Sequence, residues 1–168
     1  MTRNAAVRIR EAKGDDAEGI AAVHHAAVHH AGAEAYPPDV LQHWSGPLNR
    51  ERITDWQHRI VDPDEHFMVA ESEGVIIGFG SILAGEGRLR GTYVKPEHAR
   101  AGIGRDLLEN LEQLAISSGV NRLQVDSSLN ARHFYEAHGY ETLEQTTHLL
   151  EDGFAISCIR MAKVLKDD

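Results

Sequence analysis

The stretch Leu89–Leu114, LRGTYVKPEHARAGIGRDLLENLEQL, decides the fold of this chain. It opens as a short apolar run that Lys95-Pro96 ends, and a turn then closes on Gly102-Ile103-Gly104. Beyond the turn, apolar residues recur at the helical period, which predicts a helix with one buried face. The residues of that face are Ile103, Leu107, Leu108, Leu111, Leu114 and Ala115.

The turn before this helix has the composition of an anion-binding site. No Ser, Thr, Asp or Asn directly precedes Ile103 to accept hydrogen bonds from the first helical amides, and the two glycines let another group approach the backbone. Free amides at the positive end of a helix dipole attract phosphate. The segment 88–105 also holds five basic residues and one acid, in a chain of net charge −9. We therefore expect a phosphate-binding turn here.

The composition is typical of a soluble globular protein. The chain has 168 residues, of which 42% are hydrophobic and 26% charged, and we expect one domain over residues 1–168. No apolar run approaches the roughly 20 residues of a membrane helix, and the N-terminus lacks the apolar core of a signal peptide. A single cysteine, Cys158, excludes an internal disulfide and favours the cytoplasm. The acidic balance argues against non-specific nucleic-acid binding and mildly favours cationic partners such as amines.

Periodicity and turn residues place the other elements around this stretch. Before it we expect a strand at 7–13, a helix that ends near Gly32, one or two helical turns at 40–44, a helix at 48–60, and strands at 67–71 and 75–83. Gly78 and Gly80 in the last of these indicate a bulge or a close backbone approach. After the strand 89–94 and its helix to about residue 118, we expect a strand at 122–126, a short helix that ends at residue 139, and a hairpin of 140–150 and 154–164. This order predicts an α/β (α+β) fold whose sheet mixes antiparallel hairpins with one strand–helix–strand unit.

The glycine turn by itself is compatible with several structures. A phosphate-binding loop of the Gly-Lys-Ser/Thr type is excluded, because Arg105-Asp106 follows Gly104. A dinucleotide-binding fold would use Asp126 as its ribose acid, but Leu107 stands at the third glycine position and only one strand–helix–strand unit exists. Taken alone, a Gly-x-Gly pair favours a turn that only packs a helix against a sheet.

Two motifs, taken together, favour a functional role for this turn over simple packing. The first is Tyr93-Val94-Lys95-Pro96-Glu97 followed by Ala101-Gly102-Ile103-Gly104-Arg105-Asp106-Leu107-Leu108, and the second is Asn130-Ala131-Arg132-His133-Phe134-Tyr135-Glu136-Ala137-His138-Gly139-Tyr140. With one helix and one strand between them, they resemble the pyrophosphate-binding turn and the short signature helix of the GNAT superfamily of GCN5-related N-acetyltransferases. The resemblance implies a mostly antiparallel central sheet flanked by helices, in the order β-α-α-β-β-β-α-β-α-β-β. It also shows one departure, because Ala99 stands where the family usually has Arg or Gln.

The resemblance implies acetyl-CoA as the cofactor and assigns roles by position. The pantetheine arm would run along Tyr93 and Val94, and Asn130 would contact CoA, although a plain helix cap is an equally good role for Asn130. Tyr135 would protonate the leaving thiolate, since a phenol is protonated at neutral pH; without the motif its expected role is packing beside Phe134. The pyrophosphate would be held by the amides of Arg100, Ala101, Gly102, Ile103, Gly104 and Arg105. Because Ala99 removes one side-chain contact, we expect weaker or rearranged binding.

The acceptor of an N-acetyltransferase is an amine, which must be neutral when it attacks. The family often places an acid on the strand before the glycine turn, but Leu89-Arg90-Gly91-Thr92 holds none. Glu71, Glu86 and Asp126 are candidates for the base by strand-end position only, and surface roles are expected for each. The base therefore stays unassigned.

Acceptor recognition is expected in the N-terminal third of the chain. Tyr36 and Trp44 are the candidate substrate-binding residues, with core packing or a lid hinge as the alternative. The expected helix also holds His24-His25 and His29-His30. His25 and His29 share a helix face, but no third ligand is evident, so we expect no metal and predict that these histidines are exposed.

The sequence thus leads to two hypotheses. The first is an acetyl-CoA-dependent N-acetyltransferase that acts on a small-molecule or peptide amine by direct attack in a ternary complex. The second is a non-catalytic CoA-binding or regulatory module, favoured by Ala99 and by the missing base. Neither involves nucleic acid or a membrane. The identity of the amine stays open, and the resemblance allows a homodimer.

Overall fold

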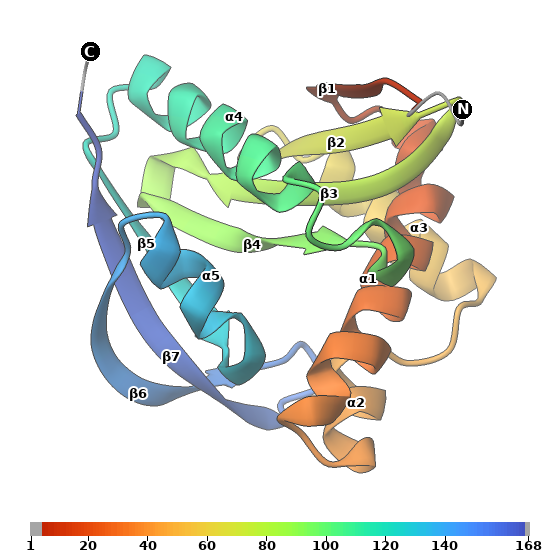
Figure 1. Ribbon diagram of the computed structural model, residues 1–168. Helices are drawn as coiled ribbons and strands as arrows, with labels where there is room; N and C mark the ends of the chain where they lie inside the picture. The colour runs from red at the N-terminus through yellow and green to blue at the C-terminus, as the bar shows by residue number, and fades with distance from the viewer. Residues whose placement is uncertain (1–4, 167–168) are drawn as a thin grey trace.

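The structure of the chain, a computed structural model, describes residues 5–166 (Figure 1). Its centre is a seven-stranded sheet in the order β1-β2-β3-β4-β5-β7-β6. Neighbouring strands are antiparallel except β4 and β5, which are parallel. The strands are Val7–Glu11 (β1), His66–Ser72 (β2), Val75–Leu83 (β3), Arg88–Val94 (β4), Arg122–Ser128 (β5), Glu141–Leu149 (β6) and Ala155–Val164 (β7).

The helix boundaries follow from local signals in the sequence. The Asn49 side chain caps the third helix by accepting a hydrogen bond of 2.9 Å from the Arg52 amide. Pro38 is the first residue of the second helix, where a missing N–H leaves no intrahelical bond unmade. The helices of the described chain are Ala17–Ala31 (α1), Pro38–Trp44 (α2), Arg50–Ile60 (α3), Ile103–Ser117 (α4) and Arg132–Ala137 (α5).

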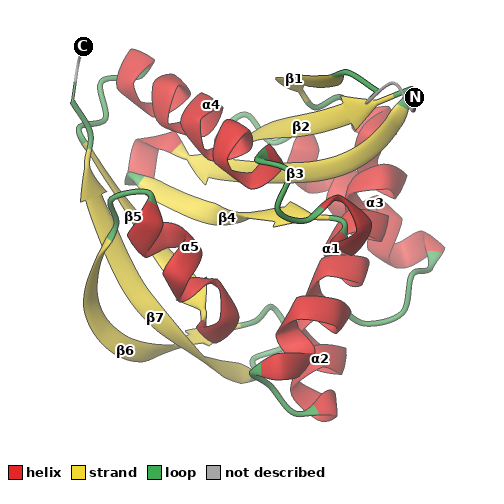
Figure 2. Ribbon diagram, viewed as in Figure 1, coloured by secondary structure: helices red, strands yellow, loops and turns green. Residues whose placement is uncertain are grey.

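Helices cover both faces of the sheet (Figure 2). On one face α4 packs on β2, β3 and β4, and α5 packs beside it on β5. On the other face α1 packs on β3 and β4, and α3 packs against α1. The first core contains Leu108, Leu111, Leu123, Val125 and Met161, and the second contains Ile20, Val23, Trp56, Phe67 and Phe79.

Glycines in β3 bring α4 unusually close to the sheet. A Cβ atom at Gly80 would lie only 2.8 Å from both the Gly91 carbonyl oxygen and Leu111 Cδ1. At Gly78 it would lie 3.1 Å from the Tyr93 carbonyl oxygen, and the β2–β3 register shifts immediately before Gly78. The sequence prediction of a bulge or a close approach at Gly78 and Gly80 is therefore confirmed.

The sheet opens between β4 and β5. These two strands pair only at Arg88 with Gln124 and at Leu89 with Val125. On its other side β5 pairs with β7 along its whole length, from Arg122 to Ser128. The later residues of β4 and β5 therefore diverge, and their facing backbone groups are not used by the sheet. Such an opening at the carboxyl ends of parallel strands is a common place for a ligand.

The predicted fold class is confirmed, with small differences in the elements. The segment expected to make one or two helical turns is the helix α2, so three helices rather than two follow the first strand. The strand expected to end at Asp126 continues to Ser128, which lengthens the edge of the opening. Within residues 5–166, no helix combines the length and the apolar character needed to cross a bilayer.

Candidate active site

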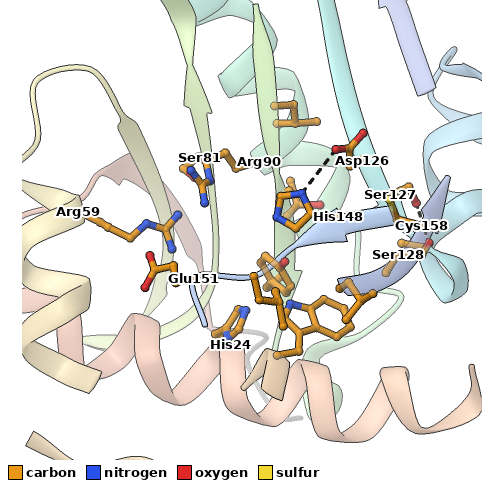
Figure 3. A pocket seen from close by; sticks show the side chains of 18 of the residues that line it. His24, Arg59, Ser81, Arg90, Asp126, Ser127, Ser128, His148, Glu151 and Cys158 are labelled. Carbon is orange, nitrogen blue, oxygen red and sulfur yellow. Dashed lines mark hydrogen bonds and ion pairs between the residues drawn. The ribbon is translucent and has the colours of Figure 1, made fainter. Parts of the chain in front are cut away.

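A cavity of about 370 Å³ lies at the opening between β4 and β5 (Figure 3). The α5 side of its wall includes Ala131, Tyr135 and Ser127. The opposite side is built from α1, α2, α3, the end of β6 and the β6–β7 turn, residues 150–154. We call this opposite side the acceptor side; its lining residues include His24, Trp44, Trp56, Arg59, His148 and Glu151.

The glycine turn leaves a row of backbone donors unused. Arg100 and Gly102 both have positive φ, 62° and 82°, and no side chain caps the start of α4. Within the described chain, the amides of residues 100–105 donate to no recorded protein acceptor. Gly104 lies under Phe134 of α5, where a Cβ atom would be 3.2 Å from the ring. The turn therefore presents free N–H groups at a helix start, as an anion site requires.

Tyr135 reaches the cavity from α5. Its side chain lies against Thr92 of β4, and the residue is only 3% exposed. Burial raises the pKa of Tyr135 above its ordinary value. The phenol therefore keeps its proton at neutral pH and is available as a proton donor inside the cavity.

Asn130 has a buried oxygen that nothing in the described chain satisfies. Its Oδ1 is the single buried side-chain polar atom without a hydrogen-bond partner in residues 5–166. No side-chain cap bond is recorded at the start of α5 or of the turn before it, which argues against the helix-cap role. An unpaired buried polar atom is costly, so this oxygen is a natural point of contact for a ligand.

Tyr93 and Val94 lie on the free edge of β4 and point to opposite faces. The Tyr93 ring lies on the acceptor side, 4.8 Å from the His24 ring and 5.2 Å from Phe79. Val94 packs in the cluster that contains Ile103 of α4. Beyond Leu89 the β4 backbone has no partner in β5, so it can receive an extended ligand on this edge.

The two predicted acceptor-binding residues are in different places. Trp44 lines the cavity, with its ring 5.6 Å from that of Tyr36. Tyr36 does not line the cavity. Its hydroxyl donates to the Ser157 carbonyl oxygen at 2.6 Å and accepts from the Leu129 amide at 2.9 Å. The Tyr36 hydroxyl therefore joins the segment before α2 to β7 and to the turn before α5.

The histidines of α1 differ from the sequence prediction, which was wrong for His24. His24 is 6% exposed and lines the cavity, because it lies one helical turn after the buried Ile20. Burial, followed by the charges of Arg59 and Arg52, lowers the pKa of His24 to about 3. The His25 and His29 rings are 4.3 Å apart, and no group of three metal-ligating side chains occurs in the described chain.

A buried ion-pair cluster supports the acceptor side, and the sequence analysis missed it. Glu65 is 5% exposed and accepts from Arg59 at 2.6 and 3.2 Å and from the Ser81 hydroxyl at 2.7 Å. Arg90 lies 3.6 Å from the same carboxylate. The Arg59 guanidinium also stacks over Trp56 at 4.5 Å. No local motif signals this cluster, because its members come from four segments.

The fold places the three candidate bases in different parts of the molecule. Glu71 binds Arg10 at the far end of the sheet, and Glu86 lies outside the cavity, in the turn before β4. Asp126 lines the cavity, and its Oδ1 accepts from Arg160 Nε at 3.0 Å. Its Oδ2 lies 3.6 Å from His148 Nδ1 (Figure 3).

An exposed contact with α2 holds the β6–β7 turn over the acceptor side. His43 Nδ1 lies 2.7 Å from Asp152 Oδ2, and the His43 ring stacks on Phe154 at 3.9 Å. His43 lowers the pKa of the Asp152 carboxyl. The turn therefore covers part of the cavity and is held by one histidine.

Comparison with known proteins gives the family. The profile described as "Acetyltransferase (GNAT) domain" matches residues 33–165. A GCN5-related N-acetyltransferase from Rhodopseudomonas palustris superimposes with a TM-score of 0.85 at 25% identity, over 98% of this chain and 100% of that chain. The PaiA N-acetyltransferase of Thermoplasma acidophilum, solved in complex with coenzyme A, gives a TM-score of 0.76 at 20% identity, over 95% of this chain and 99% of that one.

A curated relative matches over a shorter region. The IAA acetyltransferase of Azospirillum brasilense is 30% identical over 87 residues, which are 49% of this chain and 56% of that protein. This chain thus spans a little over half the length of that relative. The profile match, by contrast, includes the glycine turn, the short helix with Tyr135 and most of the sheet. The chain belongs to the GNAT family of acetyltransferases.

Proposed function

We propose that this chain is an acetyl-CoA-dependent N-acetyltransferase that acetylates a primary amine by direct attack within a ternary complex. The observation that carries the proposal is one cavity at the β4–β5 opening that contains the Tyr135 phenol, close to a helix start with unused amides. Family membership supports acetyl transfer, and the CoA complex of the Thermoplasma relative supports the cofactor.

The residues present suit coenzyme A. A pyrophosphate would accept hydrogen bonds from the amides of residues 100–105, at the positive end of α4. The amide groups of pantetheine would pair with the free edge of β4 after Leu89, and the unpaired Asn130 oxygen would accept one of their N–H groups. Ala99 contributes no side chain to the phosphates, so the main chain carries this binding.

The chemical step needs one nucleophile and one proton donor. The neutral amine nitrogen attacks the thioester carbonyl carbon, a C–N bond forms, and the C–S bond breaks with its electron pair on sulfur. The CoA thiolate takes the proton of Tyr135, and the resulting phenolate takes the surplus proton from the acylated nitrogen. The products are an amide, free CoA and a restored phenol.

Direct attack is favoured over an acyl-enzyme. Cys158 is the one cysteine of the sequence and lines the cavity. Burial, together with the charge of Asp126, raises the pKa of its thiol to about 11. Little thiolate would therefore exist at neutral pH, and a thiol is a poor nucleophile. A ternary complex needs no such intermediate.

The second candidate function is a CoA-binding module without turnover. Ala99 favours it, because this position lacks the phosphate-binding side chain usual in the family. The two functions differ in one measurable respect, since only the enzyme releases free CoA thiol in the presence of an amine.

The test is thiol release from acetyl-CoA with a panel of alkylamines, polyamines, amino acids and a peptide. We expect release with at least one acceptor, and Tyr135→Phe should lower its rate about 100-fold because the leaving thiolate loses its acid. Calorimetry should give the same CoA dissociation constant for both proteins. His133→Gln is the matched control on the same helix, since the His133 side chain is 96% exposed.

The opposite pattern would support the binding module. In that case CoA binds tightly, no acceptor in the panel releases thiol, and Tyr135→Phe behaves like the unchanged protein. An unchanged rate in Tyr135→Phe with an active acceptor would leave the enzyme in place and remove only the role of Tyr135.

A further inference from the structure

The acetyltransferase reaction proposed above needs a proton acceptor for the substrate, and none has been assigned so far in this chain. Most alkylamines are protonated at neutral pH, and an ammonium ion has no lone pair with which to attack a thioester. A group in the cavity, on the acceptor side, must therefore accept a proton from the incoming substrate. The β4 segment Leu89–Thr92 supplies no carboxylate for this purpose.

Most of the candidate groups around the cavity are already engaged. Glu65 accepts from Arg59 through both oxygens and from Ser81 through one, and it is not among the residues that line the cavity. Asp152 is bound to His43 on the exposed turn. His24 is buried, and its pKa of about 3 makes it too weak a base.

His148 differs from these groups in position and in contacts. It lies near the end of β6 and lines the same cavity as Tyr135, and 38% of its side chain is exposed. Figure 3 shows the His148 ring projecting into the middle of the cavity. Its Nδ1 faces Asp126 Oδ2 at 3.6 Å, while its Nε2 has no recorded partner in residues 5–166.

Asp126 is itself held in place by a contact with β7. Its Oδ1 accepts from Arg160 Nε at 3.0 Å, and Arg160 Nη1 donates to Glu144 at 2.9 Å. The side chain of Asp126 is only 12% exposed. The second oxygen is thus fixed towards His148, where a carboxylate favours the tautomer with the proton on Nδ1 and the lone pair on Nε2.

We propose that His148 is the general base of the acetyl transfer and that Asp126 is its positioning residue. The substrate ammonium gives a proton to His148 Nε2, and the neutral amine that remains attacks the thioester. The imidazolium then releases this proton to solvent through the open side of the cavity. Later in the reaction Tyr135 gives its proton to the sulfur and takes one from the nitrogen. The two residues therefore act on different protons, and the atoms balance over the cycle.

Other charged groups also face the cavity near His148. Arg88 and Arg90 line the cavity from β4, and Glu151 lines it from the turn. Cys158 on β7 is protonated at neutral pH, as described above. The remaining neighbours, Asp126 and Arg160, form an ion pair of net charge zero.

The test is the pH dependence of kcat/KM in His148→Gln, measured with the best alkylamine of the acceptor panel. We expect a loss of about 100-fold at pH 7, and we expect the rate to rise with pH as the free amine itself becomes available. CoA affinity and melting temperature should match those of the unchanged protein. His58→Gln, an exposed histidine of α3 outside the cavity, is the control and should change nothing.

An acceptor amine that is already neutral at pH 7 can show whether His148 acts as a general base or only maintains the shape of the site. Hydroxylamine is largely neutral at pH 7, so its acetylation needs no proton acceptor before attack. His148→Gln should therefore lose far less activity with hydroxylamine than with the alkylamine, whereas a misfolded or displaced site would lose both equally. This ratio is measured within one variant, so it stays informative even if His148→Gln is less stable.

Asp126→Asn tests the positioning role. Without the carboxylate that orients the imidazole ring, Asp126→Asn should lose more activity with the alkylamine than with hydroxylamine, as His148→Gln does, while CoA affinity stays the same. An unchanged profile in His148→Gln, or equal losses with both acceptors, would overturn the proposal while the enzyme assignment stands. Absence of thiol release from the unchanged protein with every acceptor would instead overturn the proposed function.

Discussion

The two sides of the cavity are built in different ways. The cofactor side comes from two short segments, residues 93–105 and 130–135, and it combines free backbone groups of the first with the Asn130 and Tyr135 side chains of the second. The acceptor side is assembled from α1, α2, α3, the end of β6 and the β6–β7 turn, and it relies on side chains such as His24, Arg59 and His148. Backbone groups fix a ligand common to a family, whereas dispersed side chains can change independently.

This difference predicts that substitutions on the two sides of the cavity will have different effects. Changes on the cofactor side should alter CoA binding for every acceptor, because the proposed pyrophosphate contacts are made by the main chain. Changes on the acceptor side should alter stability or acceptor kinetics and leave CoA affinity as it is. Four substitutions and one matched control test this division, beyond those already proposed for Tyr135 and His148.

Gly102→Ala should have the largest effect on cofactor binding. Its φ of 82° is a left-handed conformation, and a Cβ atom there would lie 3.0 Å from the Arg105 guanidinium. The added methyl should displace a backbone donor at the start of α4. The loss of one hydrogen bond to a charged phosphate is about 2 kcal/mol, which corresponds to about 30-fold in the CoA dissociation constant measured by calorimetry.

Gly119→Ala is a matched control for this experiment. Its φ of 81° is nearly the same, and a Cβ atom there meets nothing within 4 Å. Both variants should lose roughly 1–2 kcal/mol of stability from the left-handed backbone, but only Gly102→Ala should lose CoA affinity. Equal CoA affinity in the two variants would contradict the phosphate-binding role of the turn.

Tyr36→Phe should act on stability and not on the cofactor. The substitution removes the hydroxyl that pairs with the Ser157 carbonyl and the Leu129 amide. Two backbone groups then lose a partner, so we expect the free energy of unfolding in urea to fall by about 1.5 kcal/mol. The CoA dissociation constant should not change.

Trp44→Phe provides the complementary measurement, because Trp44 lines the cavity. We expect it to raise the KM of the acceptor at constant CoA affinity. If Tyr36→Phe raised the acceptor KM with no loss of stability, then Tyr36 would be a substrate contact, as the sequence suggested, and its structural role would be minor.

The same division explains how much the sequence could predict. The fold class and the order of elements along the chain followed from periodicity and from two motifs, because those signals are local in the chain. The free amides at the start of α4 could be predicted in the same way, since the helix start and the glycines at 102 and 104 are neighbours in sequence. Asn130 was a candidate for the same reason, and its unpaired oxygen is a feature that only coordinates reveal.

The acceptor side could not be predicted in the same way. His24 was expected on the surface, although its position one turn after Ile20 could have placed it on the buried face. Glu65 with Arg59, and Asp126 with His148, are pairs that form only when distant strands and helices meet. A bulge in β3 also reverses which residues face each side, and strand alternation alone does not show it.

The smallest predicted effect concerns the contact that holds the β6–β7 turn over the acceptor side. His43 is the main cause of the lowered pKa of Asp152, so in His43→Ala this pKa should rise towards its ordinary value, although the Phe154 amide still lowers it; NMR titration of the carboxyl carbon measures the change. Because the folded pKa is depressed, the contact stabilises the fold above pH 4 or so and is lost as the pH falls through the folded pKa. Both partners are exposed and screened by solvent, so overall stability should hardly change. The turn should become mobile nonetheless, which amide exchange at residues 150–154 would detect. If the Asp152 pKa stayed low in His43→Ala, the turn would be held by other groups, and α2 would influence the acceptor side only through Trp44.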